Sequence, residues 1–221
     1  MPPTGMTFVA IAIAYLIGAI PVGVVVCRPF GVDPRRFGSG RTGGTNVYRA
    51  AGARAAVLTV LGDVLKGTTA VLLADRLVPG DANAVATALA ALAAILGHNH
   101  SIFIRFAGGA GSTPNIGAFL ALAPGPQWFA AAGLAACAVW YFGRIASVAS
   151  LTLAACLALA CAWFATTGAR SPAILIYGLG QLALVAWALR PNIARLRQGI
   201  ELRVDRPAGS ESPPVTPSPS P

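Results

Sequence analysis

The chain has 221 residues, of which 56% are hydrophobic and 10% are charged, and its mean hydropathy is +0.69. Soluble domains carry about a quarter charged residues, so this composition excludes an ordinary soluble domain and indicates an integral membrane protein. In such a protein a net charge of +9 is typical of cytoplasmic loops that contact anionic lipid, so we expect the lipid bilayer as a partner and no nucleic acid.

Seven apolar runs approach the length of about 20 residues that a helix needs to cross a bilayer. They are Thr7–Cys27, Ala55–Val78, Asn83–Gly97, Gly111–Ala123, Gln127–Phe142, Ala146–Thr166 and Pro172–Leu189. The third and fourth runs are short, and residues 97–111 between them form either a turn or a re-entrant segment. We therefore expect an all-α membrane protein with about seven transmembrane helices.

The two ends of the chain differ in character. The first apolar run lacks a basic start and an Ala-x-Ala cleavage site, which favours a retained span over a signal peptide. Within it, Gly18, Pro21 and Gly23 predict a kink or a close approach between helices. We expect residues 1–206 to form one membrane domain and the Pro- and Ser-rich residues 207–221 to form a disordered tail.

The distribution of positive charge predicts the orientation of the helices. Thirteen arginines fall on one side of the expected bilayer: Arg28, Arg35, Arg36, Arg41, Arg49, Arg54, Arg105, Arg144, Arg190, Arg195, Arg197, Arg203 and Arg206. The other side holds Arg76 and Arg170, and Lys66 lies within a span. Because cytoplasmic loops concentrate positive residues, we expect a multi-pass protein of the cell inner (plasma) membrane, with its N-terminus outside and its C-terminus in the cytoplasm.

The most polar segment of this apolar chain is Phe37–Arg49, which reads FGSGRTGGTNVYR. Glycine loses more backbone entropy on folding than any other residue, so we expect no helix or strand here. The segment can instead direct backbone N–H groups, hydroxyls and the guanidinium groups of Arg41 and Arg49 at one small anion. Its position on the predicted cytoplasmic side makes it the first candidate site.

Two charged residues interrupt the second apolar run. Asp63 and Lys66 are three positions apart, so they share one face of a helix and can form an ion pair. A charge near the middle of a span costs about 2.5–3.5 kcal/mol, so the two charges need a reason. Either the pair neutralises itself, with Lys66 reaching toward the interface, or one of the two lines a polar cavity beneath the first loop.

The only two histidines of the chain, His98 and His100, precede a second glycine-rich segment at residues 107–115. A single histidine is more often structural than catalytic. Here the histidines, the glycines and a helix start expected near Pro114 together favour a second anion-binding site. His98 is the stronger functional candidate of the two.

Two further segments lie on the predicted cytoplasmic side. In Arg144–Ser150, Ser147 or Ser150 either caps a helix or contributes to the site. Arg190–Glu201 has the pattern of a basic amphipathic helix, and we expect most of its arginines at lipid head groups. The four cysteines lie in apolar runs without metal-ligand spacing and are expected to be packing thiols. The sequence contains no hydrolase-elbow, zinc-protease or P-loop motif and no repeat that would support an inverted-repeat transporter.

Taken together, these segments resemble the acyl-phosphate:glycerol-3-phosphate acyltransferases, the PlsY family, over residues 8–203. The family's first motif, G-S-G-N-x-G-A-T-N-x-x-R, is similar to Gly38–Arg49, and its D-x-x-K-G motif matches Asp63–Gly67. Its G-H dipeptide and G-G-K-G loop are similar to Gly97-His98 and to Gly108–Gly111. Its R-I-x-S-V-x-S and N-I-x-R-L…G-x-E motifs then recur at Arg144–Ser150 and Asn192–Glu201.

The chain departs from the family pattern at four places. Arg41 stands where the family has Asn, and Ala110 stands where it has the lysine of its phosphate site. Ser112-Thr113-Pro114 replaces V-A-T, and Leu189 and Pro191 replace a His and a Glu that flank the last motif. One positive charge is lost in the third motif and one is gained in the first. We therefore hypothesise that Arg41 supplies the cation that is lost at Ala110.

The resemblance implies transfer of a fatty acyl group from acyl phosphate to the sn-1 hydroxyl of glycerol 3-phosphate at the cytoplasmic face. It implies no cofactor, no metal and no protein nucleophile, because a substrate phosphate acts as the base. The implied catalytic residues are Ser39, Arg49, His98 and Ser147. The implied substrate-binding residues are Gly38, Gly40, Arg41, Thr45, Asn46, Lys66, Gly108, Gly109, Gly111 and Asn192.

Two alternatives remain open at this point. One is a catalytically impaired or altered-specificity paralogue that binds lipid precursors. The other is a small anion transporter with Asp63 and Lys66 in its pathway. The sequence leaves the oligomeric state open in all three cases.

Overall fold

The computed structural model describes residues 3–125 and 144–204, together with a few positions between 127 and 141. Its longer elements are α1 (Pro3–Ala19), α2 (Val22–Cys27), α3 (Gly44–Leu77), α4 (Asn83–Asn99), α5 (Ser112–Leu122), α7 (Ala146–Thr166), α8 (Ile174–Ala188) and α9 (Arg190–Arg197). Short 3-10 turns occupy Arg28–Phe30, Pro34–Arg36 and Ile102–Ile104. The described residues contain no strand, which confirms the all-α fold class. The predicted run Gln127–Phe142 falls largely outside the described residues, and the predicted tail 207–221 lies wholly outside them.

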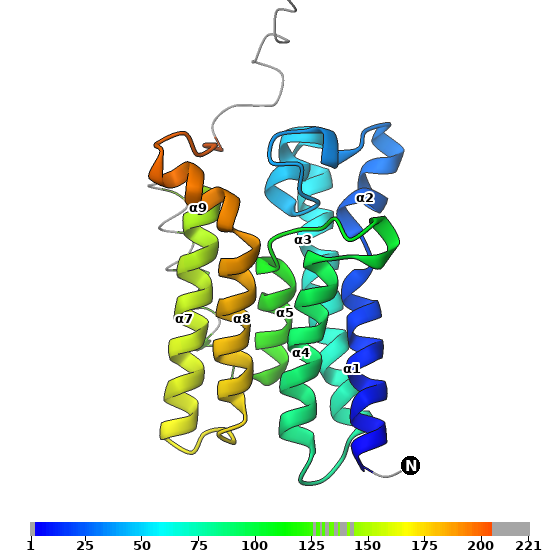
Figure 1. The fold of residues 1–221 in the computed structure, drawn as a ribbon, viewed down its shortest axis with the longest axis vertical. Helices are drawn as coiled ribbons and strands as arrows, with labels where there is room; N and C mark the ends of the chain where they lie inside the picture. The colour runs from blue at the N-terminus through cyan, green and yellow to red at the C-terminus, as the bar shows by residue number, and fades with distance from the viewer. Residues whose placement is uncertain are drawn as a thin grey trace, which may run out of the picture.

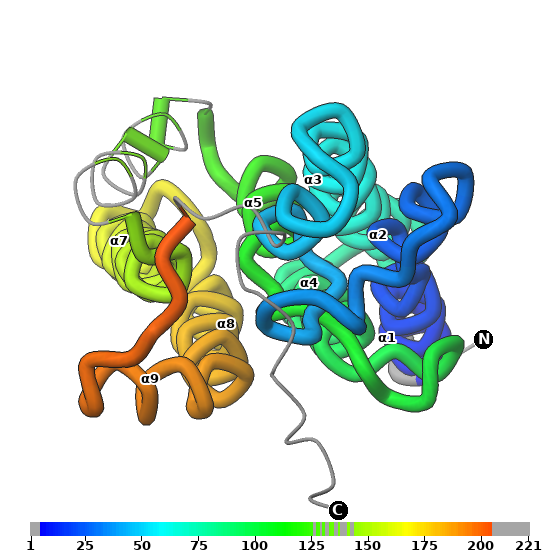
Figure 2. Tube along the Cα trace, turned by 90° about the horizontal axis from the view of Figure 1, so that it is seen from above, coloured from blue at the N-terminus to red at the C-terminus, as the bar shows by residue number. Residues whose placement is uncertain are grey.

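The helices form two groups that stand side by side (Figures 1 and 2). α1 to α5 make up one group, and α7 to α9 make up the other, with α4 and α8 in contact between them. Small residues allow close packing in the first group: a Cβ added to Gly18 would lie 2.1 Å from the backbone oxygen of Ala94. Close approach through small residues is typical of helices packed in a membrane.

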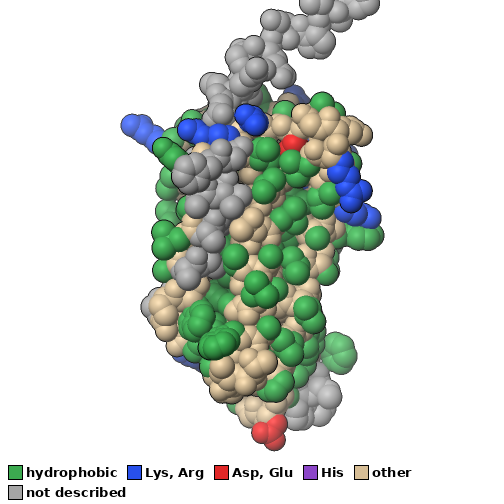
Figure 3. Space-filling model, turned by 90° about the vertical axis from the view of Figure 1, so that its left-hand side faces the viewer, with side chains coloured by type: hydrophobic (Ala, Val, Ile, Leu, Met, Phe, Trp, Pro, Cys, Tyr) green, Lys and Arg blue, Asp and Glu red, His purple; other side chains and the backbone are tan. Residues whose placement is uncertain are grey.

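Four segments in the described part of the chain are long and apolar enough to cross a bilayer: Gly5–Phe30, Gly44–Leu77, Asn83–Ile104 and Ala146–Thr166. A fifth is possible if α8 and α9, which meet at a bend of 60°, count as one span. The predicted fourth run does form a helix, but α5 has 11 residues, fewer than the roughly 20 needed to cross alone. Hydrophobic side chains cover much of the face drawn in Figure 3, and most of its positively charged side chains gather toward one end.

The first span bends where the sequence predicts it. α1 ends at Ala19 and α2 begins at Val22, so the break falls at Ile20 and Pro21. Proline has no N–H group to continue the helix ladder. After the break, a Cβ on Gly23 would lie 2.0 Å from the backbone oxygen of Thr42. The glycine therefore lets the first polar loop lie directly on α2.

The expectation that Phe37–Arg49 forms no helix is wrong for its second half. α3 begins at Gly44 rather than at Ala55, and its helical path is interrupted at Gly52, where φ is 81° and ψ is −176°. Tertiary packing offsets the low helix propensity of glycine here. A Cβ on Gly44 would lie 2.5 Å from Val60, and Val47 is fully buried. The half with Thr45 and Arg49 is thus held as the opening turns of a helix.

Candidate active site

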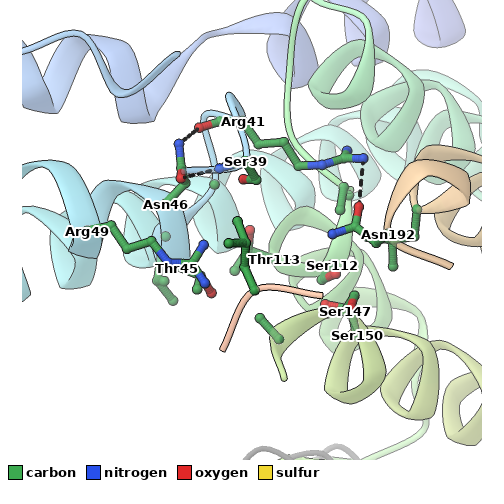
Figure 4. Close-up of a pocket in the computed structure, with 18 of the residues that line it drawn as sticks. Ser39, Arg41, Thr45, Asn46, Arg49, Ser112, Thr113, Ser147, Ser150 and Asn192 are labelled. Atoms are coloured by element: carbon green, nitrogen blue, oxygen red, sulfur yellow. Dashed lines mark hydrogen bonds between the residues drawn. The ribbon is translucent and has the colours of Figure 1, made fainter. Parts of the chain in front are cut away.

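A pocket of about 150 Å³ lies between the two helix groups, at the end of the bundle that carries the polar loops. Its walls come from the first loop, the starts of α3, α5 and α7, the junction of α8 with α9, and the segment after α9. The polar side chains that line it include Ser39, Arg41, Thr45, Asn46, Arg49, His98, Ser112, Thr113, Ser147, Ser150, Asn192 and Glu201. Figure 4 shows ten of these around the cavity.

Asn46 shapes the first loop. Its Nδ2 donates to the backbone oxygens of Pro34 and Arg41, both at 2.7 Å, and its Oδ1 accepts from the backbone N–H of Ser39 at 3.1 Å (Figure 4). The side chain is buried, so its polar atoms are used within the loop. Gly38 and Gly40 make the turn beneath it with φ of 46° and 70°, a region that glycine adopts without strain. Asn46 therefore positions Ser39 and Arg41 for the pocket.

Arg41 reaches across the pocket. Its Nη1 donates to the backbone oxygen of Gly109 at 3.1 Å, and its Nη2 donates to Asn192 Oδ1 at 3.2 Å and to the backbone oxygen of Ala188. The two carbonyl groups immediately precede Ala110 and Leu189, two of the positions at which the chain departs from the family pattern. Burial, helped by repulsion from Arg195 and opposed by Glu201, lowers the pKa of Arg41, but a guanidinium stays charged in a protein. The guanidinium therefore lies at the peptide group that precedes Ala110, and Arg41 and Ala110 both line the pocket.

Arg49 supplies a second cation from the opening turns of α3. Its Nη2 donates to the backbone oxygen of Arg203 at 3.3 Å, so it also touches the segment after α9. In Figure 4, Arg41 and Arg49 extend from the first loop and from α3 toward different parts of the cavity. Two positive groups with separate positions suit two anionic groups.

The second glycine loop lies directly against His98. A Cβ on Gly109 would be 2.0 Å from His98 Nε2, and a Cβ on Gly108 would be 2.1 Å from the backbone oxygen of His98. The N–H of Gly109 donates to that same oxygen at 3.1 Å, and the N–H of Thr42 donates to the oxygen of Gly108 at 3.4 Å. The glycines are required here by close approach, and they join the two loops into one layer.

A buried charge cluster lies behind the pocket. Lys66 Nζ is 2.9 Å from Asp63 Oδ1, which confirms the predicted ion pair, and it also donates to the backbone oxygen of Ile20 at 2.9 Å. His98 Nδ1 is 3.4 Å from the same carboxylate oxygen, and Thr113 Oγ1 is 3.4 Å from Oδ2. Lys66 does not line the pocket, whereas His98 and Thr113 do. The pair therefore supports the wall from behind.

The start of α5 forms a third wall. Gly111 precedes the helix with φ of 85°, and no side chain caps the helix among the described residues. The Ser112 hydroxyl is buried and has no hydrogen-bond partner in the described part of the chain. The first N–H groups of a helix carry partial positive charge and lack partners within the helix. Ser112 and this helix end therefore offer neutral donors to an anion, whereas the Thr113 hydroxyl already donates to Asp63 Oδ2.

Glu201 organises the fourth wall. Its Oε1 accepts from Ser147 Oγ at 2.9 Å and from Asn192 Nδ2 at 2.6 Å, and its Oε2 is 2.8 Å from Arg195 Nε. Burial alone would raise the pKa of this carboxyl, but these hydrogen bonds and the charge of Arg195 outweigh it, so the pKa lies below its ordinary value. Arg195, expected at lipid head groups, is instead used inside the protein. Glu201 thereby holds Ser147 and Asn192 together.

Ten of the residues predicted from the sequence line the pocket: Ser39, Arg41, Thr45, Asn46, Arg49, His98, Gly111, Ser147, Ser150 and Asn192. Five do not line it, namely Gly38, Gly40, Lys66, Gly108 and Gly109. Ser112 and Thr113 were predicted only as part of the second glycine-rich segment, and Glu201 only as the last residue of the final motif. Ser112 and Thr113 could have been identified as site residues because two hydroxyls stand together at an expected helix start. Glu201 could have been identified because it is a single carboxylate in a basic segment.

A family model described as glycerol-3-phosphate acyltransferase matches residues 8–199. A glycerol-3-phosphate acyltransferase of Roseiflexus sp. is 40% identical over 207 residues, which cover 93% of this chain and 99% of the relative. One of Anaeromyxobacter dehalogenans is 43% identical over 208 residues, covering 92% and 100%.

Solved structures give the same result. A crystal structure of PlsY (YgiH), an integral membrane glycerol 3-phosphate acyltransferase in its glycerol 3-phosphate form, superposes with a TM-score of 0.78. It is 31% identical and covers 89% of this chain and 94% of the other. The lysophosphatidic acid form of the same enzyme gives a TM-score of 0.77 at 30% identity, with the same coverage.

Proposed function

The chain belongs to the glycerol-3-phosphate acyltransferase family of membrane enzymes, and from this membership we propose that it transfers a fatty acyl group from acyl phosphate to the sn-1 hydroxyl of glycerol 3-phosphate. The products are lysophosphatidic acid for phospholipid synthesis and inorganic phosphate. The observation that carries the proposal is the single pocket in which Arg41 and Arg49 meet hydroxyls from three different helix starts. Both substrates carry phosphate, and the pocket offers two cations.

We assign one phosphate to the wall made by Ser39, Thr45 and Arg49. Asn46 holds this wall in place through its hydrogen bonds to the loop. We assign the acyl-phosphate group to the opposite wall, where Arg41 lies beside Ala110 and near Asn192. His98 and the start of α5 border this second position. Charge-assisted hydrogen bonds to phosphate are stronger than neutral ones, so the two arginines dominate binding.

The chemical step forms one bond and breaks another. The sn-1 oxygen of glycerol 3-phosphate attacks the carbonyl carbon of acyl phosphate, and the bond from that carbon to the phosphate oxygen breaks. Phosphate leaves and takes up the proton of the attacking hydroxyl, so no protein nucleophile is needed. Positioning and charge stabilisation then supply most of the rate, because phosphate is already a good leaving group.

Arg41 takes over the role of the missing lysine in this proposal. Its hydrogen bond to the oxygen of Gly109 holds the guanidinium at the peptide group that precedes Ala110, and both residues line the pocket. A guanidinium is planar and binds two oxygens at once, whereas an ammonium is a point charge. The hydroxyl of Ser112, where the family has Val, adds a donor to the same region. The net charge of the site is kept while its shape changes.

The proposal includes an orientation. The described arginines of the first loop, of the start of α7 and of α9 are at the end of the bundle that holds the pocket. Because positive residues concentrate on the cytoplasmic side, we infer that the pocket faces the cytoplasm from the plasma membrane. The phosphate groups of acyl phosphate and glycerol 3-phosphate are both hydrophilic, so they can enter the pocket from the cytoplasm.

The test is an assay of the purified protein with acyl phosphate and radiolabelled glycerol 3-phosphate. We expect release of phosphate in equal amount with lysophosphatidic acid acylated at sn-1. An acyl thioester in place of acyl phosphate serves as the donor control. Binding of glycerol 3-phosphate without turnover would favour an impaired paralogue, and uptake into liposomes without product would favour a transporter.

A further inference from the structure

A second cavity is lined by residues at the ends of helices that lie opposite the active-site pocket, and Figure 1 shows these helix ends. Its volume is about 380 Å³. The walls come from the last turns of α3, the first turns of α4, the end of α5 and the residues that lead into α8. The proposed acyl transfer makes no use of this cavity, so its function is a separate question.

The cavity is apolar at its base and charged at its rim. Val71, Ala88 and Ile174 contribute buried apolar side chains. Asp75 and Arg170 line the same cavity and are exposed. Ligand sites commonly combine an apolar lining with a few placed polar groups. A molecule that fits here has an apolar part and a head that carries both charges.

The two charges are held apart by neutral partners. Asp75 Oδ1 accepts from Asn83 Nδ2 at 3.0 Å, and Arg170 Nη2 donates to the backbone oxygen of Ala123 at 2.9 Å. Among the described residues no ion pair joins Asp75 to Arg170, although both line one cavity. In the same part of the chain, Asp75 Oδ2 and the Nε and Nη1 groups of Arg170 have no hydrogen-bond partner. An acceptor and a set of donors are thus left for a ligand.

We propose that this cavity binds the zwitterionic head group of a bilayer phospholipid with a primary amine, of the phosphoethanolamine class. The ammonium group donates to Asp75, the phosphate accepts from Arg170, and the glycerol with its first methylenes lies on the apolar base. A purely anionic head group meets repulsion from Asp75. A quaternary ammonium has no N–H to donate to the carboxylate. The cavity therefore selects a primary amine beside a phosphate.

The test counts lipids retained on the purified full chain by native mass spectrometry. Phosphatidylethanolamine, phosphatidylcholine and phosphatidylglycerol with identical acyl chains are offered at equal concentration. We expect the ethanolamine lipid to be retained most. Since a charge near the head groups contributes on the order of 1 kcal/mol, Asp75→Asn and Arg170→Gln should each weaken retention about fivefold.

Matched controls are available at the same end of the bundle. Arg76→Gln and Asp81→Asn remove exposed charges that do not line the cavity, and they should retain the ethanolamine lipid as the wild type does. Equal retention of the glycerol lipid, or wild-type retention by both cavity variants, would overturn the proposal. So would binding of free phosphoethanolamine as tight as that of the lipid, because the bilayer source would then be wrong. Lipid retention does not depend on acyltransferase activity, so this test is independent of the proposed function.

Discussion

Arg41 and Asn192 are 151 positions apart in the chain, and Nη2 of the arginine donates to Oδ1 of the asparagine at 3.2 Å. This contact joins the first loop to the start of α9 across the mouth of the pocket. The same guanidinium also donates to Gly109 in the second loop. One side chain therefore connects three separate segments of the site, and its removal affects both binding and the shape of the pocket.

Arg41→Asn restores the residue type of the family motif and should lower kcat/KM. Loss of a charge-assisted contact to phosphate costs about 1–3 kcal/mol, which corresponds to about 5- to 150-fold. Steady-state kinetics with acyl phosphate as the varied substrate measures this effect. Arg54→Gln, an exposed arginine that does not line the pocket, is the control. Activity of Arg41→Asn within about twofold of wild type would refute the role given to Arg41.

A charge-swap variant tests compensation directly. In Arg41→Asn/Ala110→Lys, the cation returns at the position where the family has it. Because the guanidinium of Arg41 lies beside Ala110, the double variant should recover most of the activity lost in Arg41→Asn. Ala110→Lys alone puts two cations together and should not exceed wild type. Additive losses in the double variant would show that the two positions act independently.

Asp63→Asn should destabilise the protein at the buried charge cluster behind the pocket. Asp63 is 1% exposed, and the change leaves the ammonium of Lys66 buried without its counter-charge. Breaking one partner of a buried pair costs about 3–5 kcal/mol. Thermal unfolding in detergent should show a large drop in Tm. The double variant Asp63→Leu/Lys66→Met removes both charges and should regain most of the stability, and equal Tm values for the single and double variants would contradict the pairing.

Gly109→Ala places a methyl group 2.0 Å from His98 Nε2. The imidazole is buried and lies 3.4 Å from the Asp63 carboxylate, so it has little freedom to move away. Overpacking of this kind costs about 1–3 kcal/mol, and we expect that loss in stability together with a lower kcat. Gly133→Ala, where an added Cβ meets nothing within 4 Å, should not lower Tm, because alanine favours a helix over glycine. A wild-type kcat in Gly109→Ala would show that His98 is not held as described.

Glu201 should contribute to the fall of Tm when the pH is lowered. Its folded pKa lies below the ordinary value because hydrogen bonds from Asn192, Arg195 and Ser147 favour the carboxylate despite burial. A lowered pKa contributes stability that is fully present above the unfolded value and is lost as the pH falls through the folded value. Glu201→Gln should therefore lower Tm at neutral pH and flatten the fall in Tm on acidification. An unchanged acid limb in this variant would assign the effect to other carboxylates.

The sequence predicts features that depend on local spacing. Asp63 and Lys66 pair because three positions along a helix bring side chains to one face. The break at Pro21 follows from the missing N–H group. The anion-binding character of the first loop is predicted from the glycines and polar residues that lie between Arg41 and Arg49. In each case the cause lies within a few residues of the effect.

Features that depend on tertiary packing were missed. Glu201 gains its role from Ser147, 54 positions away, and no local pattern indicates that contact. α3 begins early because Gly44 packs on Val60 and Val47 is buried, which outweighs the low helix propensity of the segment. The ammonium of Lys66 is held by its local partner Asp63 and by the distant oxygen of Ile20, and its role in substrate binding stays a prediction. Long-range partners decided the role of Glu201 and the start of α3.

The hydrogen bond from the N–H of Thr42 to the oxygen of Gly108 ties the first loop to the second. Thr42 is also buried against α2, where Gly23 allows its carbonyl to approach. Segments linked in this way open as one cooperative unit of local unfolding. The amides of both loops should then share one free energy of opening in hydrogen exchange. An opening that frees one product would free the other as well, which couples the release of phosphate to that of the acylated lipid.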